Sequence, residues 1–136
     1  MTQLRDRSRA LATVIDLSRT IGRPEAELVI LAEGNTSVRT AGDRMLVKAT
    51  GSFLATADET DFVEVDLPIY HDLLATVGAS DETVAAQLEA AVVAGSKRPS
   101  VESLLHAVCL TVPGVEVVAH THPIACLLYT SPSPRD

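Results

Sequence analysis

This chain of 136 residues has few cysteines, no long apolar run and no excess of basic residues. Its two cysteines, Cys109 and Cys126, cannot build a disulfide framework, and we expect Cys109 to be a small buried apolar residue. No apolar stretch approaches the roughly 20 residues that cross a membrane, and the charged N-terminus lacks the apolar core of a signal peptide. The net charge of -7 argues against nucleic acid as a partner. We therefore expect a cytoplasmic protein that binds neither nucleic acid nor membranes.

Glycine-rich signatures of nucleotide sites are also absent. The seven glycines form neither the Walker A pattern, which needs a Lys as well, nor the dinucleotide-binding pattern. No internal repeat is visible. Length and a hydrophobic content of 46% predict one domain with a sizeable core.

Hydrophobic periodicity predicts alternating helices and strands along the chain. A first amphipathic helix should end near Ile21, because Gly22 and Pro24 follow it. Ser100 is well placed as the N-cap of a later helix. Further helices are predicted at residues 68–77, 83–94 and 100–111, and strands at residues 45–47, 62–65 and 115–119, the last of them buried.

Two histidines follow the last predicted strand, as His120-Thr121-His122. Side chains two apart in a strand point to the same side, so both imidazoles can reach one metal ion. Histidines without a metal are common, and two ordinary packed residues are the alternative.

Two polar turns offer groups that bind anions. Gly34 can bring its backbone close to a ligand, and Asn35 adds side-chain donors. Thr50 and Gly51, just after a predicted strand, offer a hydroxyl and exposed amides. Either turn alone could be an ordinary polar connection, but together they favour a phosphate site.

Glu102 is the candidate for proton transfer. It lies in the first turn predicted after Ser100, where the helix dipole favours a carboxylate, and one turn before His106. The loop at Pro113 and Gly114 allows this helix to fold back, so that Glu102 approaches the two histidines. A stabilising first-turn carboxylate is the alternative for Glu102, and a packed helix residue is the expected role of His106.

The last residues have a different origin in our interpretation. Residues 126–136 match, residue for residue, a translation of the transposase adapter used in sequencing-library preparation. We therefore expect residues 1–125 to be the natural segment and residues 126–136 not to be native protein. A disordered tail rich in Ser and Pro is the alternative.

Four motifs in one order resemble the class II aldolase/adducin family, and within it the L-fuculose-phosphate aldolases. The resemblance covers roughly residues 25–125, which would be the N-terminal part of such a domain. The motifs are Gly34-Asn35-Thr36-Ser37, Thr50-Gly51-Ser52, Pro99-Ser100-Val101-Glu102 and His120-Thr121-His122.

The resemblance implies a three-layer α/β/α fold with a central mixed, largely antiparallel sheet. It also implies a homotetramer and a zinc-dependent aldehyde-lyase that cleaves a small ketose phosphate or related sugar acid. In this family three histidines hold Zn²⁺, which polarises the substrate as a Lewis acid, while a glutamate moves the proton. Carried over, His120 and His122 are metal ligands, Glu102 is the acid/base, and Gly34, Asn35, Thr50, Gly51 and Ser100 contact the phosphate.

The sequence departs from the family pattern in two respects. Val101 stands where the fuculose-phosphate aldolases have a second Ser, which removes one hydroxyl from the phosphate site. The third metal-binding His should lie beyond residue 125, so we expect residues 1–136 alone to be inactive.

A Glu at position 102 resembles the aldolases more than the ribulose-phosphate epimerases. Epimerisation, dehydration, decarboxylation or a non-catalytic adducin-like role are the alternatives.

Overall fold

The computed structural model describes residues 6–126, so most of the segment matched to the adapter lies outside the described residues. Five strands form one sheet in the order β4-β3-β2-β1-β5, and every pairing in it is antiparallel. Within this part of the chain, no helix is both long and apolar enough to cross a membrane. The strands are β1 (Asn35–Thr40), β2 (Arg44–Lys48), β3 (Phe62–Asp66), β4 (Val92–Ala94) and β5 (Val117–His120).

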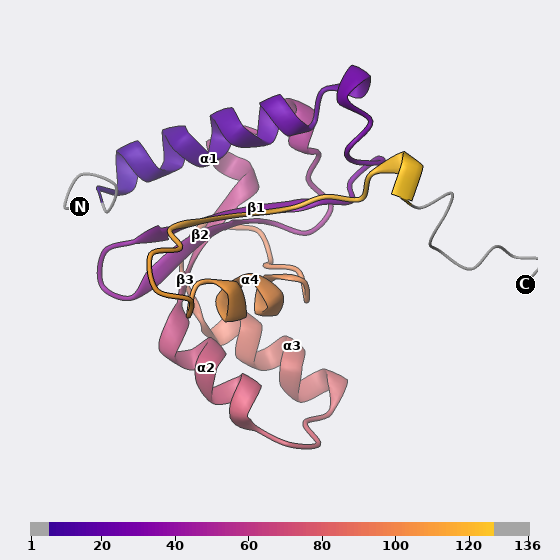
Figure 1. Cartoon of the computed structure of the whole chain (residues 1–136). Coiled ribbons are helices and arrows are strands. Elements are labelled where there is room, and N and C mark those ends of the chain that lie inside the picture. The colour runs from indigo at the N-terminus through magenta and orange to yellow at the C-terminus, as the bar shows by residue number, and fades with distance from the viewer. Residues whose placement is uncertain (1–5, 127–136) are drawn as a thin grey trace, which may run out of the picture.

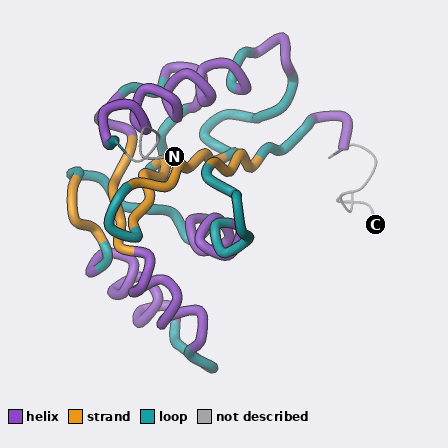
Figure 2. The backbone as a smooth tube through the Cα atoms, turned by 60° about the vertical axis from the view of Figure 1, so that its left-hand side comes forward, coloured by secondary structure: helices purple, strands orange, loops and turns teal. Residues whose placement is uncertain are grey.

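Helices cover both faces of this sheet (Figure 1). The first helix, α1, lies along one face, and three shorter helices lie on the other. Figure 2 shows the strands running between these two groups. The predicted three-layer α/β/α fold and the dominance of antiparallel pairs are confirmed. The helices are α1 (Arg7–Ile21), α2 (Leu67–Ala75), α3 (Asp81–Ala90) and α4 (Ser103–Cys109), with short 3-10 turns η1 (Pro24–Ala26), η2 (Leu54–Thr56) and η3 (Glu59–Asp61).

Side-chain alternation along the central strands builds two apolar cores. In β2, Met45 and Val47 belong to the core beneath α2, α3 and α4, whereas Leu46 between them packs with α1. Residues such as Tyr70 and Leu88 complete the larger core from the helices. Because both faces are apolar, β2 reads as a continuous hydrophobic run, typical of a strand covered on both sides.

Several predicted elements are confirmed. Helix α1 ends at Ile21 with Gly22 as its C-cap, and β2, β3 and α2 lie within a few residues of their predicted positions. The helix predicted to reach Ala94 ends instead at Ala90, and β4 follows it. Val92 pairs with Val65 of β3, so a β-branched residue extends the edge of the sheet there.

The strand predicted at residues 115–119 is present but not buried. It runs from Val117 to His120 and alternates between exposed and half-buried residues, with Val117 36% exposed. The cause is its position, because β5 ends the order of strands and is paired, among residues 6–126, with β1 alone.

Candidate functional site

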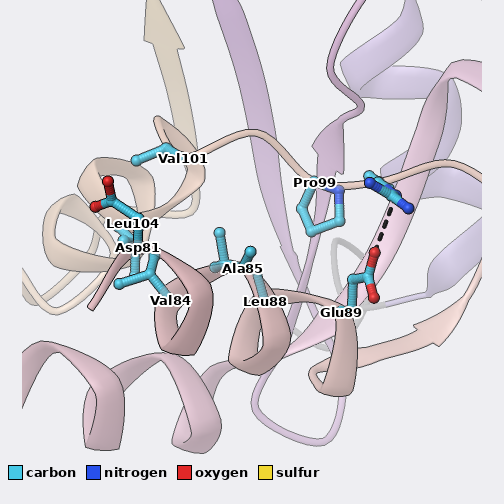
Figure 3. Close-up of a pocket in the computed structure, with 9 residues that line it drawn as sticks. Asp81, Val84, Ala85, Leu88, Glu89, Pro99, Val101 and Leu104 are labelled. Carbon is cyan, nitrogen blue, oxygen red and sulfur yellow. Dashed lines mark ion pairs between the residues drawn. The ribbon is translucent and has the colours of Figure 1, made fainter. Parts of the chain in front are cut away.

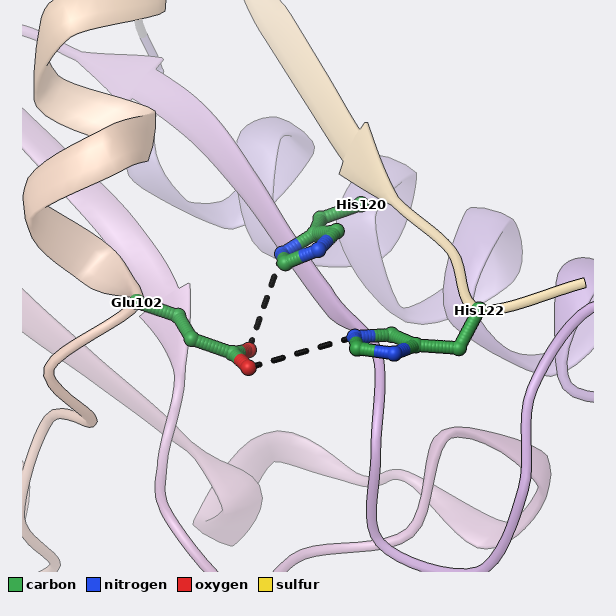
Figure 4. A group of neighbouring side chains, drawn as sticks. All are labelled: Glu102, His120 and His122. Atoms are coloured by element: carbon green, nitrogen blue, oxygen red, sulfur yellow. Dashed lines mark ion pairs between the residues drawn. The ribbon is translucent and has the colours of Figure 1, made fainter. Parts of the chain in front are cut away.

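The two histidines of the His-x-His motif converge with Glu102 (Figure 4). The Nδ1 atom of His120 lies 3.6 Å from Oε2 of Glu102, and Nε2 of His122 lies 3.9 Å from Oε1. The two imidazole ring centres are 4.8 Å apart. The structure thus brings together residues that are up to 20 positions apart in the chain, as the folding back of the helix onto the strand predicts.

These side chains fit a divalent metal ion. One donor atom from each of Glu102, His120 and His122 lies within 4.8 Å of the others. His120 Nδ1 and His122 Nε2 are both buried and have no hydrogen-bond partner, which is costly unless a further group binds them. Two imidazole nitrogens and a carboxylate oxygen are donors that Zn²⁺ prefers. The donor chemistry and the two unpartnered nitrogens therefore fit a metal.

Backbone pairing fixes the position of both histidines. His120 ends β5 and is the register partner of Asn35 in β1. The N–H of His122 donates to the carbonyl of Leu28 at 2.8 Å, and the N–H of Ile124 donates to the carbonyl of Glu27 at 3.0 Å. His122 is therefore held beyond the end of the strand by a second set of backbone hydrogen bonds.

Glu102 occupies the N-cap position of α4, which starts at Ser103. The prediction that Ser100 caps this helix is therefore wrong. Residues 101 and 102 form a turn ahead of α4, and the carbonyl of Ser100 accepts from the N–H of Ser103 at 3.0 Å. This turn leaves the Ser100 hydroxyl free to accept from Asn35 Nδ2 at 3.0 Å.

His106 is a packed helix residue, as expected, but it lies close to the cluster. Its Nδ1 is 2.7 Å from the hydroxyl of Ser37 in β1, and its ring centre is 6.2 Å from that of His120. Burial lowers the pKa of His106 to about 4, and the charge of His120 adds to this shift. His106 is thereby kept neutral, and it joins α4 to the sheet behind the two histidines.

The predicted phosphate-binding residues line one cavity of about 410 Å³. The two polar turns thus meet, although they come from different parts of the sheet, and Glu102 of the cluster with His120 and His122 lines the same cavity. The residues brought together there include Gly34, Asn35, Thr50, Gly51, Ser100 and Glu102.

Gly34 allows a close approach that other residues cannot make. Its φ is +86°, and a Cβ atom there would lie 2.7 Å from Cγ1 of Val29 and 3.2 Å from the carbonyl oxygen of His120. Gly51 also has a positive φ, of +77°, but open space lies around it. Gly34 is therefore required by its φ and by packing against β5, and Gly51 by its turn alone.

A chain of hydrogen bonds holds Ser100 and Asn35 of this cavity in place. The Tyr70 hydroxyl lies 2.8 Å from that of Ser103, which donates to the carbonyl of Ser100 at 2.5 Å. Ser100 in turn accepts from Asn35, whose own Oδ1 accepts from the N–H of Thr36. Burial raises the pKa of Tyr70 to about 12, so this hydroxyl keeps its proton. Helix α2 thus orients the cavity through the start of α4.

Lys48 is a cavity residue that the sequence analysis missed. Its side chain is only 3% exposed, and Nζ donates to the carbonyls of Ser52 at 2.6 Å and Ala32 at 3.2 Å. Burial lowers the pKa of Lys48, and the charges of Glu102 and Asp61 oppose that shift. A lone Lys at the end of an apolar strand, two residues before Thr50, is the signal that marks it.

A second cavity, of about 330 Å³, lies between α3 and the turn before α4 (Figure 3). Its walls are largely apolar, and an ion pair between Arg98 and Glu89 at 2.9 Å closes one end. Val101, 67% exposed, lines both cavities. No member of the Glu102, His120 and His122 cluster lines this second cavity, so the cavity is separate from that cluster.

Several solved structures have a fold similar to that of this chain. The N-terminal class II aldolase domain of a conserved protein from Thermoplasma acidophilum is 30% identical, with a TM-score of 0.75, over 90% of this chain and 59% of that one. The L-fuculose-1-phosphate aldolase of Thermus thermophilus is 24% identical, with a TM-score of 0.57, over 90% of this chain and 49% of that one. YgbL from Escherichia coli, provisionally described as an aldolase/epimerase/decarboxylase, is 17% identical, with a TM-score of 0.59, over 84% and 44%.

The last two likenesses are of fold only, and the chain spans about half the length of those proteins. Among curated protein sequences, none matches the chain significantly. The family model described as the class II aldolase and adducin N-terminal domain matches residues 12–134. The match covers most of the chain, and the protein therefore belongs to the class II aldolase and adducin N-terminal domain family.

Proposed function

We propose that this domain is part of a metal-dependent aldehyde-lyase that cleaves a small ketose phosphate or a related sugar acid in a retro-aldol reaction. One observation carries the proposal: Glu102 faces both His120 and His122 and also lines the polar cavity. A substrate in that cavity would have its reacting carbons beside an acid/base group and a metal site at once.

His120 and His122 would hold the metal, with Zn²⁺ as our choice because it suits imidazole donors. A third histidine, outside this sequence, would complete the set. The metal supplies Lewis-acid polarisation of the substrate's carbonyl and hydroxyl oxygens. Imidazole also suits iron, nickel and copper, so metal analysis of the purified protein is needed to identify the ion.

Glu102 would move the proton. As the carbon–carbon bond of the ketose breaks, the aldehyde leaves and the other carbon keeps the electron pair. The Glu102 carboxylate would take the hydroxyl proton of the aldehyde half, and the carboxyl group so formed would give that proton to the carbon that keeps the electron pair. The reaction then balances and the carboxylate is regenerated. The carboxylate is half-buried and lies beside both histidines, which supports a place at the reacting centre.

The cavity favours an anionic end on the substrate. Gly34, Asn35, Thr50, Gly51 and Ser100 line it with amides and hydroxyls, and Lys48 adds a cationic group that attracts a phosphate or carboxylate. Val101 places an isopropyl group on this wall, where the fuculose-phosphate aldolases have a hydroxyl. We therefore include sugar acids beside sugar phosphates as candidate substrates.

A different reaction of the same superfamily is the second candidate. The likeness in fold to YgbL favours it, since that protein is described with three alternative reactions. Epimerisation, dehydration and decarboxylation would each use the same metal ligands and proton-moving carboxylate, so Glu102, His120 and His122 do not separate them. A non-catalytic adducin-like domain is less well supported, because it would have no need of two buried, unpartnered imidazole nitrogens.

The full-length protein would be a cytoplasmic homotetramer in this proposal. The experiment that tests the reaction is product analysis on a panel of ketose phosphates and sugar acids, beginning with L-fuculose 1-phosphate. Release of an aldehyde supports the lyase, whereas an epimer, a dehydrated product or carbon dioxide identifies an alternative. No product from any substrate, together with no bound metal, would favour the non-catalytic domain.

A further inference from the structure

His122 lies between two carboxylates, one at each ring nitrogen. Its Nε2 points to Glu102, at 3.9 Å from Oε1, and its Nδ1 lies 3.4 Å from Oε2 of Glu33. Glu33 immediately precedes Gly34 and lines the polar cavity, yet no role in the chemistry proposed above falls to it. We propose that Glu33 is a positioning residue that holds the proton of His122 on Nδ1, so that Nε2 offers its lone pair to the metal site. The inference rests on the proposed metal binding by His122.

The physical reason is the position of one proton. A neutral imidazole carries a proton on one nitrogen and a lone pair on the other, and only the nitrogen with the lone pair can bind a metal. A carboxylate beside Nδ1 draws the proton to that atom, which leaves the lone pair on Nε2. Carboxylates that contact a ligating histidine in this way fix its ring orientation and raise its basicity.

The other atoms around His122 agree with this assignment. Nε2 is the buried nitrogen without a hydrogen-bond partner, and it faces the centre of the cluster. At the other side of the ring, the Glu33 carboxylate is 57% exposed and forms no ion pair with a Lys or Arg within residues 6–126. The ring therefore has an acceptor at Nδ1 and an open site for a ligand at Nε2.

The backbone holds this contact in register. The segment that carries His122 pairs with Leu28, on the loop that leads to Glu33. The same loop is tied further along by the N–H of Glu33, which donates to the carbonyl of Ile30 at 2.9 Å. Backbone hydrogen bonds therefore anchor both Glu33 and His122, and this keeps their side chains in contact.

The variants that test this are Glu33→Ala, which removes the acceptor, and Glu33→Gln, which keeps an oxygen of similar size and place. Glu25→Ala is the matched control, because Glu25 is an exposed carboxylate in η1 on the same connection and does not line the cavity. Since the Glu33 side chain is mostly exposed, its removal should leave the fold intact, which the amide NMR spectrum checks.

The first readout is the tautomer of His122, measured from its ring ¹⁵N shifts in the metal-free protein at pH 8. The wild type and Glu33→Gln should carry the proton on Nδ1, and Glu33→Ala should shift it toward Nε2. The second readout is Zn²⁺ affinity by chelator competition. Glu33→Ala should bind about 10- to 100-fold more weakly, Glu33→Gln should recover part of the loss, and Glu25→Ala should match the wild type.

The two readouts separate the two proposals. An unchanged His122 tautomer in Glu33→Ala overturns the role of Glu33, even if the variant binds zinc poorly. A full-length wild-type protein that binds no metal overturns metal binding by this domain, whereas the tautomer in the metal-free protein still decides what Glu33 does. Equal zinc affinity in the wild type and Glu33→Ala would also overturn the inference.

Discussion

Asn35 and His120 are direct partners in the register of β1 and β5. Paired residues in antiparallel strands have Cα atoms about 4.5–5.5 Å apart and side chains on the same face. One of the two lines the polar cavity and the other belongs to the metal cluster. The cavity and the cluster are therefore built on the same pair of residues, and the spacing between them is fixed by the sheet.

Replacing either histidine of the cluster should abolish tight metal binding. His120→Asn or His122→Asn removes one imidazole ligand. Loss of a residue that only contacts a ligand costs up to about 100-fold in metal affinity, so we expect loss of the ligand itself to cost at least that much. Chelator competition measures this. His71→Asn is the control, because His71 lies in α2 and outside the cluster. Zinc binding that survives in both cluster variants would show that the metal binds elsewhere.

Two glycine variants separate backbone strain from packing. Both Gly34 and Gly42 have positive φ, but a Cβ on Gly42 meets nothing within 4 Å. Gly42→Ala should therefore cost about 1 kcal/mol of unfolding free energy from its φ alone. Gly34→Ala should cost about 1–3 kcal/mol more, because its Cβ would overlap Val29. Chemical denaturation compares the two, and equal costs would contradict the close packing of Gly34 against Val29.

Acid should destabilise the fold through His106. Its pKa falls from the ordinary 6.5 to about 4 in the folded protein because it is buried. Below pH 6.5 the unfolded chain takes up a proton that the folded chain does not accept until about pH 4, so stability is full above pH 6.5 and is lost as the pH falls through this window. The slope is up to about 1.4 kcal/mol per pH unit.

Urea unfolding at pH 7 and pH 5 measures this effect. His106→Gln is the matched variant, because its amide can still bond to Ser37 but does not titrate. It should lose less stability than the wild type between the two pH values. The same pH dependence in both proteins would assign the acid sensitivity to other groups.

Local sequence signals predict those elements of the fold that have one dominant pattern. Helix α1 has its periodicity and Gly22, and β2 has an apolar run, so both are found where expected. Strand β1 has neither, because its first residues are polar and yet buried. Thr36 is within 2.7 Å of the Ser18 hydroxyl, and Ser37 contacts His106. These partners come from distant helices, and only the tertiary structure shows that the predicted polar turn at Asn35 is a strand.

The sequence motifs predict most residues of the candidate site, but they do not predict all of the contacts among them. The motifs name Glu102, His120 and His122, and folding brings them together. Lys48 was not predicted because only the residues of the two polar turns were considered as anion ligands. Its place in the cavity follows from its position as the last residue of β2. The contact of Glu33 with His122 depends on the pairing of residues 122–124 with residues 27–28, which no local pattern reports.

The boundary at residue 125 stays a prediction. We expect that sequencing the source DNA across the codon for Ala125 shows a frame that departs from residues 126–136. The continued frame should encode further strands and helices with at least one more His, since a metal held by three histidines needs it. Source DNA that encodes residues 126–136 and then stops would contradict this prediction and would favour a non-catalytic domain.

In the proposed reaction, Glu102 moves the proton of a metal-dependent cleavage. The most direct test is aldehyde release from L-fuculose 1-phosphate and the sugar panel by the full-length protein and its Glu102→Gln variant, with bound zinc measured in both and Glu82→Gln as an exposed control from α3. We predict that Glu102→Gln keeps its zinc and loses at least about 100-fold in turnover, while Glu82→Gln matches the wild type. Unchanged turnover in Glu102→Gln would contradict a role of Glu102 in proton transfer.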